Sequence, residues 1–276
     1  MLATLIIVFR EVLEAGLIVG IVLAATRGLP HRGFWVATGI AAGIAGACVV
    51  AAFAGEIANL FAGTGQELFN AAVLLIAVVM LTWHNGWMAA HGRELAQEMR
   101  RVGADVVSGE RPLTALAVVV GIAVLREGSE VVLFLYGIAA SGENTAFGML
   151  AGGALGVIGG AAISALLYFG LLTIPLRYLF GVTSALIIFL AAGLASQAVA
   201  FLQQAGYFEA FTDAVWDTSW LLSNDSFVGR LLHTFIGYTD RPNQAQLLAY
   251  AATVVTMVAV MRVVKTRDAG RRVQAS

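Results

Sequence analysis

Seven long apolar segments constrain the fold of this 276-residue chain more than any other feature. Each is long enough to cross the hydrocarbon core of a bilayer, which is about 30 Å thick. Only 12% of the residues are charged, about half the share in a soluble domain. The segments lie at roughly 2–25, 34–54, 69–90, 113–137, 146–172, 178–202 and 245–263. The sequence therefore predicts an all-α, polytopic membrane protein with seven transmembrane helices in the lipid bilayer.

The basic residues predict the orientation of these spans. Nearly all Lys and Arg residues outside the spans follow the first, third and fifth spans or lie in the C-terminal tail, whereas the opposite side has only Arg230 and Arg241. Cytoplasmic loops carry the excess of such residues. We expect a multi-pass protein of the cytoplasmic (inner) membrane, with its N-terminus outside and its C-terminus in the cytoplasm. The net charge of -1 excludes the usual kind of basic nucleic-acid-binding protein.

A charged motif, R-E-x-x-E, occurs twice inside these apolar segments. The first copy begins at Arg10 and includes Glu11 and Glu14; the second consists of Arg126, Glu127 and Glu130. At 100° per residue, the three charged side chains of each copy share one helix face. Each charge near the centre of a span costs about 2.5–3.5 kcal/mol on insertion scales. Such costly residues indicate a functional site.

Four glutamates against two arginines leave a surplus of negative charge, which favours a cation site formed by Glu11, Glu14, Glu127 and Glu130. Arg10 and Arg126 would balance the charge of the empty site. The alternative is structural, because an Arg–Glu pair can also hold two helices together. The two interpretations are compatible.

The motifs also indicate an internal repeat within a single membrane domain. Three spans per repeat is an odd number, so a second repeat would enter the membrane in the opposite direction, as in inverted-repeat transporters with a site near the midplane. We expect the following division of residues 1–276: first repeat 1–90, inverted second repeat 112–203, outer loop with an amphipathic helix 204–244, seventh helix 245–264 and cytoplasmic tail 265–276.

Two rows of small residues predict close helix packing. Gly148, Gly152, Gly156, Gly160 and Ser164 recur at every fourth position of the fifth span, and the second span has Gly39, Gly43 and Ala47. Such rows let helix backbones approach closely. The spacing does not distinguish packing inside one chain from packing between two chains.

Weaker candidates lie outside the motifs. His84 and Gln197, each in a predicted span, could line an ion pathway or be ordinary buried polar residues. In the outer loop, Glu209, Asp213 and Asp217 recur every four residues, which predicts an amphipathic helix near 206–222 whose acidic face could capture a metal. The metalloprotease, di-iron and serine-hydrolase signatures are missing. We therefore expect a transporter without a cofactor rather than an enzyme.

The paired motifs resemble those of the high-affinity iron permeases, which include fungal oxidase-coupled ferric permeases and the permease subunit of a bacterial three-component iron uptake system. The likeness to the bacterial branch extends over nearly the whole chain. It includes Leu81-Thr82-Trp83, Ala191-Ala192-Gly193-Leu194-Ala195, Ala205-Gly206 and Phe235-Ile236-Gly237-Tyr238. The family motif is R-E-G-L-E, and this chain has Val12-Leu13 and Gly128-Ser129 at the two variable positions of its copies.

The resemblance implies that the chain is a permease that imports ferric iron, which an extracytoplasmic partner protein oxidises or delivers. It assigns the metal role to the four motif glutamates. Carboxylate oxygens suit a hard cation such as Fe³⁺. The alternatives are a divalent heavy-metal (lead-type) permease, a cation/proton antiporter that uses the same carboxylates, and a scaffold or intramembrane enzyme in which the motifs are only structural.

Overall fold

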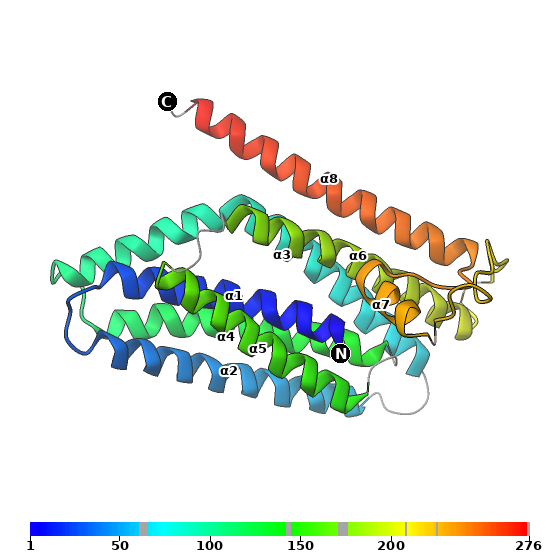
Figure 1. Cartoon of the computed structure of the whole chain (residues 1–276), viewed down its shortest axis with the longest axis horizontal. Coiled ribbons are helices and arrows are strands. Elements are labelled where there is room, and N and C mark those ends of the chain that lie inside the picture. Colours follow the sequence, from blue (N-terminus) through cyan, green and yellow to red (C-terminus); the bar gives the residue numbers. More distant parts are fainter. Residues whose placement is uncertain (61–65, 142–144, 171–175, 208, 225, 275–276) are drawn as a thin grey trace.

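The computed structural model describes residues 1–60, 66–141, 145–170, 176–207, 209–224 and 226–274. These residues form helices joined by loops, with no β-strand and one isolated bridge between Ala214 and Asn243. The helices are α1 (Leu2–Ala25), α2 (Arg32–Leu60), α3 (Gln66–Val107), α4 (Thr114–Ala140), α5 (Ala146–Tyr168), α6 (Leu176–Gln204), α7 (Phe227–Ile236) and α8 (Gln244–Gln274), and Figure 1 shows their arrangement.

Five segments of the described residues are long and apolar enough to cross a membrane. They are Arg32–Glu56, Gln66–Met88, Ala146–Tyr168, Phe180–Gln204 and Gln244–Val264. The two other predicted spans coincide with α1 and α4, which have 24 and 27 residues and contain the R-E-x-x-E motifs. At 1.5 Å per residue, both are long enough for a bilayer core of about 30 Å. The three charged residues of the motif in each helix distinguish α1 and α4 from the other five segments.

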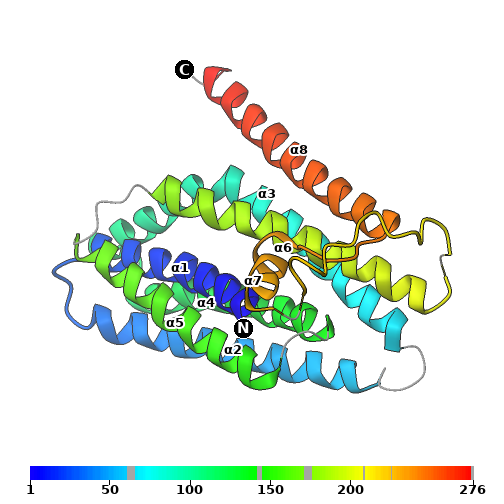
Figure 2. The ribbon, with the colours of Figure 1, turned by 45° about the vertical axis from the view of Figure 1, so that its right-hand side comes forward.

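The helices pair in a reciprocal pattern. α1 packs mainly against α5, and α2 packs mainly against α4, whereas α1 and α2 make few contacts with each other. α3 packs against α6, and α8 contacts both of these helices. In Figures 1 and 2, α8 lies along the α3–α6 side and its C-terminal end diverges from the bundle.

Small residues bring the paired helices together. A Cβ atom at Gly156 of α5 would lie 2.9 Å from the backbone oxygen of Leu5 and 2.9 Å from the backbone nitrogen of Phe9 on α1. At Gly43 of α2, it would lie 2.8 Å from the backbone oxygen of Gly121 on α4. The small-residue rows of α5 and α2 therefore pack inside this chain.

Two apolar cores show that α1 and α4 run antiparallel. Ala3 and Ile7, at the start of α1, pack in one core with Phe134 and Ile138 from the end of α4. Farther along α1, Ile18 and Val22 belong to a second core with Leu116 and Val120 from the start of α4. On both helices the charged motif lies between residues of the two cores.

The segment between α6 and α8 differs from the prediction. Residues 209–222 are not helical, so the helix expected near 206–222 is wrong; the helix of this segment is α7. Positive φ angles at Gly206 and Phe211 turn the backbone away from a helical path. The backbone bonds instead with residues before α8: Val215 N donates to Pro242 O at 2.9 Å, and Thr218 N donates to Asp240 O at 2.9 Å.

Two helices extend beyond the predicted spans. α3 continues to Val107, past the expected end at residue 90, and α8 continues through residues that we expected to form a separate tail. The additional part of α3 contributes Met99 and Val106 to the second apolar core. Packing therefore supports the continuation of α3.

Candidate metal centre

Helical spacing places the charges of each motif together. On α1, Arg10 NH1 lies 3.2 Å from Glu11 Oε1, and Arg10 Nε lies 2.9 Å from Glu14 Oε1. All three side chains are buried, and that of Arg10 is only 2% exposed. The first motif is thus a closed ion-pair cluster in which one guanidinium group serves two carboxylates.

The second motif is more open. Arg126 Nε lies 3.2 Å from Glu130 Oε1 and 3.9 Å from Glu127 Oε1. The Arg126 side chain is 33% exposed. Its guanidinium carbon lies 4.0 Å from the centroid of the Trp87 ring on α3, which is a cation–π contact. The Trp87 indole ring therefore packs against one face of the Arg126 guanidinium group.

The two motifs meet at His84 of α3. Glu11, Glu127, Glu130 and His84 each offer one ligand atom, and these atoms all lie within 4.8 Å of one another. His84 Nε2 lies 3.4 Å from Glu14 Oε2 and 3.7 Å from Glu11 Oε2, and His84 Nδ1 contacts Glu130 Oε2. Carboxylates from both motifs and one imidazole thus surround one small region.

Buried oxygens without hydrogen bonds make this region suitable for a cation. Oε2 of all four motif glutamates (Glu11, Glu14, Glu127 and Glu130) has no hydrogen-bond partner among the described residues. A buried carboxylate oxygen without a partner is costly. Ionised, the four glutamates and two arginines have a formal charge of -2. A bound cation would satisfy the free oxygens and reduce this charge.

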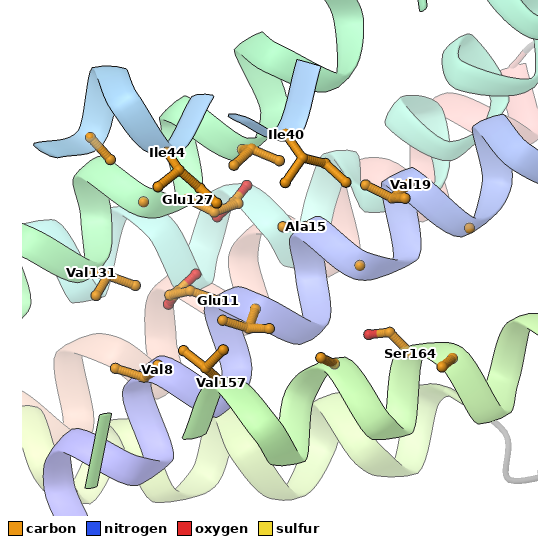
Figure 3. A pocket seen from close by; sticks show the side chains of 18 of the residues that line it. Val8, Glu11, Ala15, Val19, Ile40, Ile44, Glu127, Val131, Val157 and Ser164 are labelled. Atoms are coloured by element: carbon orange, nitrogen blue, oxygen red, sulfur yellow. The ribbon is translucent and has the colours of Figure 1, made fainter. Parts of the chain in front are cut away.

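A cavity of about 760 Å³ reaches this cluster from α1, α2, α4 and α5. Glu11 and Glu127 lie near each other in its wall among aliphatic side chains such as Val8, Ile44 and Val131 (Figure 3). The lining extends to Leu23 near the end of α1 and to Tyr168 and Phe169 at the end of α5. The cavity therefore connects the carboxylates with that end of the bundle.

Residues 1–267 match the iron permease FTR1 family. The chain belongs to this family. The permease is 32% identical over 255 residues to the ferrous iron permease EfeU of Escherichia coli O6:H1, with 91% of each chain covered. It is 29% identical over 281 residues to the ferrous iron permease EfeU of Yersinia pestis, with 100% of this chain and 98% of the relative covered. No solved structure matches the permease.

The structure separates the candidate residues of the permease into two groups. The four motif glutamates, the two motif arginines and His84 come together in one cluster, in which Arg126 and Glu130 are partly exposed. Gln197 does not belong to this cluster. Its side-chain NH₂ donates to the backbone oxygen of Ser141 at 2.8 Å. Ser141 is 11 residues beyond Glu130, which corresponds to about 16 Å along a helix.

The acidic residues of the segment between α6 and α8 do not form one helix face. Glu209, Asp213 and Asp217 are exposed, but the backbone there is not helical. Asp217 Oδ1 accepts hydrogen bonds from the hydroxyl and backbone N–H of Ser219, and Arg241 NH2 lies 3.0 Å from its Oδ2. These contacts lower the pKa of Asp217 to about 2. Asp217 thus stabilises the loop, and the helical face on which the expectation of metal capture rested is not formed by residues 209–222.

Sequence reasoning missed two neighbours of the site. Trp87 supports Arg126, and Asn85, which is buried beside His84 in the chain, accepts a hydrogen bond of 3.2 Å from the hydroxyl of Ser184 on α6. The available signal was the polar group His84-Asn85 between Trp83 and Trp87 inside an apolar segment. Which helix this group would face depends on long-range packing.

Proposed function

We propose that the permease imports iron across the cytoplasmic membrane through one site shared by both R-E-x-x-E motifs. The observation that carries this proposal is the convergence of α1 and α4, which brings Glu11 and Glu127 together with free buried oxygens. Membership of the iron permease FTR1 family supports iron as the ion. The motif arginines would balance the carboxylates when no iron is bound.

The proposal includes seven transmembrane helices: an inverted 3+3 repeat followed by α8. The reciprocal pairs α1–α5 and α4–α2 support it, because the second helix of each half packs on the first helix of the other half. Equivalent motif positions also make equivalent contacts. A Cβ at Gly160 of α5 would lie 2.9 Å from the Val12 Cβ, and one at Gly128 would lie 2.7 Å from the Ala47 Cβ of α2.

For direction, we propose that the N-terminus is outside and that iron leaves toward the cytoplasm. The cavity beside Glu11 and Glu127 supports this direction, since it extends to Leu23 and Tyr168 at the predicted cytoplasmic ends of α1 and α5. Its apolar wall offers few competing ligands. Three positive charges moving inward across 100 mV, inside negative, gain about 7 kcal/mol.

For the form of iron, we propose Fe³⁺, because the motifs supply hard carboxylate oxygens. The second candidate is Fe²⁺. Two observations favour it: the relatives are named ferrous iron permeases, and a divalent ion would neutralise the formal charge of -2. Uptake of radioactive iron by proteoliposomes decides between the two forms when it is measured with ferric citrate and, without oxygen, with ascorbate-reduced iron.

The ferric form needs an extracytoplasmic partner that oxidises iron or delivers it oxidised. We propose that such a partner meets the outer side of the permease, where the segment between α6 and α8 exposes Glu209, Asp213 and Asp217. If Fe³⁺ alone enters the proteoliposomes, uptake from Fe²⁺ should require added oxidant. Uptake of Fe²⁺ without oxidant would contradict the ferric proposal.

The motifs are tested by Glu11→Gln and Glu127→Gln, which retain shape and remove one charge each. Each change should reduce iron uptake sharply while the purified protein stays monodisperse. Glu94→Gln, at an exposed position in the distal part of α3, is the control and should transport as the unmodified chain does. Normal uptake by either motif variant would contradict a shared site. Loss of assembly would favour the purely structural alternative.

The antiporter and heavy-metal alternatives need separate measurements. A cation/proton antiporter would acidify or alkalise the vesicle lumen when Na⁺ or K⁺ is added without iron, and we expect no such change. A lead-type permease would transport Pb²⁺ in preference to iron. We expect excess Pb²⁺ to compete weakly with iron for uptake.

A further inference from the structure

His84 lies between the two motifs but belongs to neither. It comes from α3, and its side chain is only 3% exposed. Nδ1 contacts Glu130 Oε2 of the second motif, whereas Nε2 faces Glu14 Oε2 at 3.4 Å and Glu11 Oε2 at 3.7 Å in the first motif. The two nitrogens of one ring thus face carboxylates from opposite halves of the chain.

The four glutamates differ in how their oxygens are used. Glu130 places Oε1 at 3.2 Å from Arg126 Nε and Oε2 in contact with His84 Nδ1, whereas the Oε2 atoms of Glu14 and Glu11 lie 3.4 Å and 3.7 Å from His84 Nε2. Oε2 is buried and makes no hydrogen bond in all four glutamates. The Oε2 atoms that do not touch the ring directly therefore come from Glu11, Glu14 and Glu127.

The contact with Glu130 sets which ring nitrogen of His84 is available. A carboxylate in contact with Nδ1 favours the tautomer in which Nδ1 carries the proton and directs it toward Glu130. The lone pair then lies on Nε2, which points to Glu11 and Glu14. Histidines that bind metals almost always have this arrangement, with the other ring N–H donating to a carboxylate, backbone carbonyl or water.

The distances around Nε2 agree with an ion between the ring and the first motif. A nitrogen and an oxygen that bind one first-row metal, each about 2.1 Å from it, lie about 3.0–3.4 Å apart at angles between 90° and the tetrahedral value. The 3.4 Å and 3.7 Å separations are close to this range. They are too long for good hydrogen bonds, and Nε2, like Nδ1, makes none among the described residues.

We propose that His84 binds the transported iron through Nε2, together with Glu11, Glu14 and Glu127, and that Glu130 is a positioning residue that orients the ring. This inference rests on the proposed function. It gives the first motif two metal-binding glutamates and the second motif one metal-binding and one positioning glutamate. It also names a determinant of selectivity: a nitrogen donor favours iron over Mg²⁺, Ca²⁺ and Mn²⁺, which carboxylates alone would accept.

The direct test is pulsed EPR of the purified full-length chain with less than one equivalent of Cu²⁺ as the probe. Coordinated imidazole gives a characteristic modulation from its remote nitrogen, which changes when the histidines are labelled with ¹⁵N. We expect this signal in the unmodified chain, and excess iron should displace it. The unmodified chain is measured first, so this result does not depend on whether a variant folds.

Variants assign the signal. His84→Gln should remove it, whereas His91→Gln, two turns farther along α3, should retain it. The His91 ring stacks on Trp87 at a centroid distance of 5.1 Å and is not part of the cluster. Glu130→Gln should keep the signal and raise the KM for iron uptake about 10–100-fold, the usual cost of losing a residue that orients a metal ligand. His84→Gln should raise KM further and reduce the preference for iron over Mn²⁺.

Two results would overturn the inference and leave the proposed function intact. One is the absence of the nitrogen signal although iron displaces the Cu²⁺ and Glu11→Gln prevents its binding. The other is unchanged iron KM and Mn²⁺ discrimination in a monodisperse His84→Gln variant. The proposed function fails separately, if the unmodified chain neither binds nor transports iron.

Discussion

Replacing Arg10 with alanine should destabilise the permease more than the same change at Arg126, although both arginines begin the same motif. The Arg10 side chain is 2% exposed and contacts two carboxylates, Glu11 and Glu14, that are themselves fully buried. Arg126 is 33% exposed and contacts Glu130, which is also in contact with His84. Loss of Arg126 therefore leaves Glu130 with its His84 contact, whereas loss of Arg10 leaves Glu11 and Glu14 without the guanidinium group that they share.

The magnitude follows from burial. Removing one partner of a buried ion pair costs about 3–5 kcal/mol, because it leaves an uncompensated charge. We expect Arg10→Ala to lose about this much unfolding free energy. Partly exposed pairs contribute much less, so for Arg126→Ala we expect about 1–2 kcal/mol, including the lost packing on Trp87.

Unfolding of the purified variants in mixed micelles, titrated with SDS and followed by tryptophan fluorescence, measures both losses. The double variant Arg10→Ala/Glu14→Gln is the control for mechanism. It removes one of the two stranded charges and should regain part of the stability. Arg10→Lys should also recover only part, since lysine restores the charge without the planar group that holds two carboxylates.

Two outcomes would refute this reasoning. Equal losses for Arg10→Ala and Arg126→Ala would show that burial does not set the cost. Unchanged stability of Arg10→Ala with complete loss of iron uptake would show that this arginine acts on the ion path rather than on charge balance.

Three further predictions concern the carboxylates, the helix packing and the outer loop. Glu11→Gln and Glu14→Gln should each reduce iron uptake sharply without lowering membrane expression; near-normal uptake would reject them as ligands. Gly156→Ala should lower the midpoint of thermal unfolding because its Cβ meets the α1 backbone, whereas Gly181→Ala, with open space around it, should not. Because hydrogen bonds lower its folded pKa to about 2, Asp217 should stabilise the loop fully above pH 4 and lose this effect as pH falls through 2; a carboxyl pKa near 4 in NMR titration would contradict this.

The sequence predicted those parts of the permease that depend on local spacing. The apolar segments correspond to the long helices, and the i, i+4 spacing placed Arg10 beside Glu14 and Arg126 beside Glu130. The convergence of α1 and α4 on His84 depends on how distant segments pack. A histidine inside an apolar segment signals a buried polar group, but it does not identify the helices that surround that group.

The segment between α6 and α8 shows the limit of periodicity as a guide. Acidic residues every four positions predicted a helix near 206–222, yet Val215 and Thr218 direct their backbone N–H groups to Pro242 and Asp240, more than 20 residues away. Backbone hydrogen bonds between residues so far apart in the chain cannot be predicted from the spacing of acidic side chains. The helix of this segment instead begins after Ser226, whose hydroxyl accepts a 2.9 Å hydrogen bond from Gly229 N.

The central claim is that both motifs form one iron site. Anomalous diffraction at the iron absorption edge, from crystals of the iron-loaded permease, tests it most directly. The account predicts one anomalous peak per chain, within bonding distance of both Glu11 on α1 and Glu127 on α4. Two separate peaks, each beside one motif, or no peak between α1 and α4 in protein that retains bound iron, would contradict it.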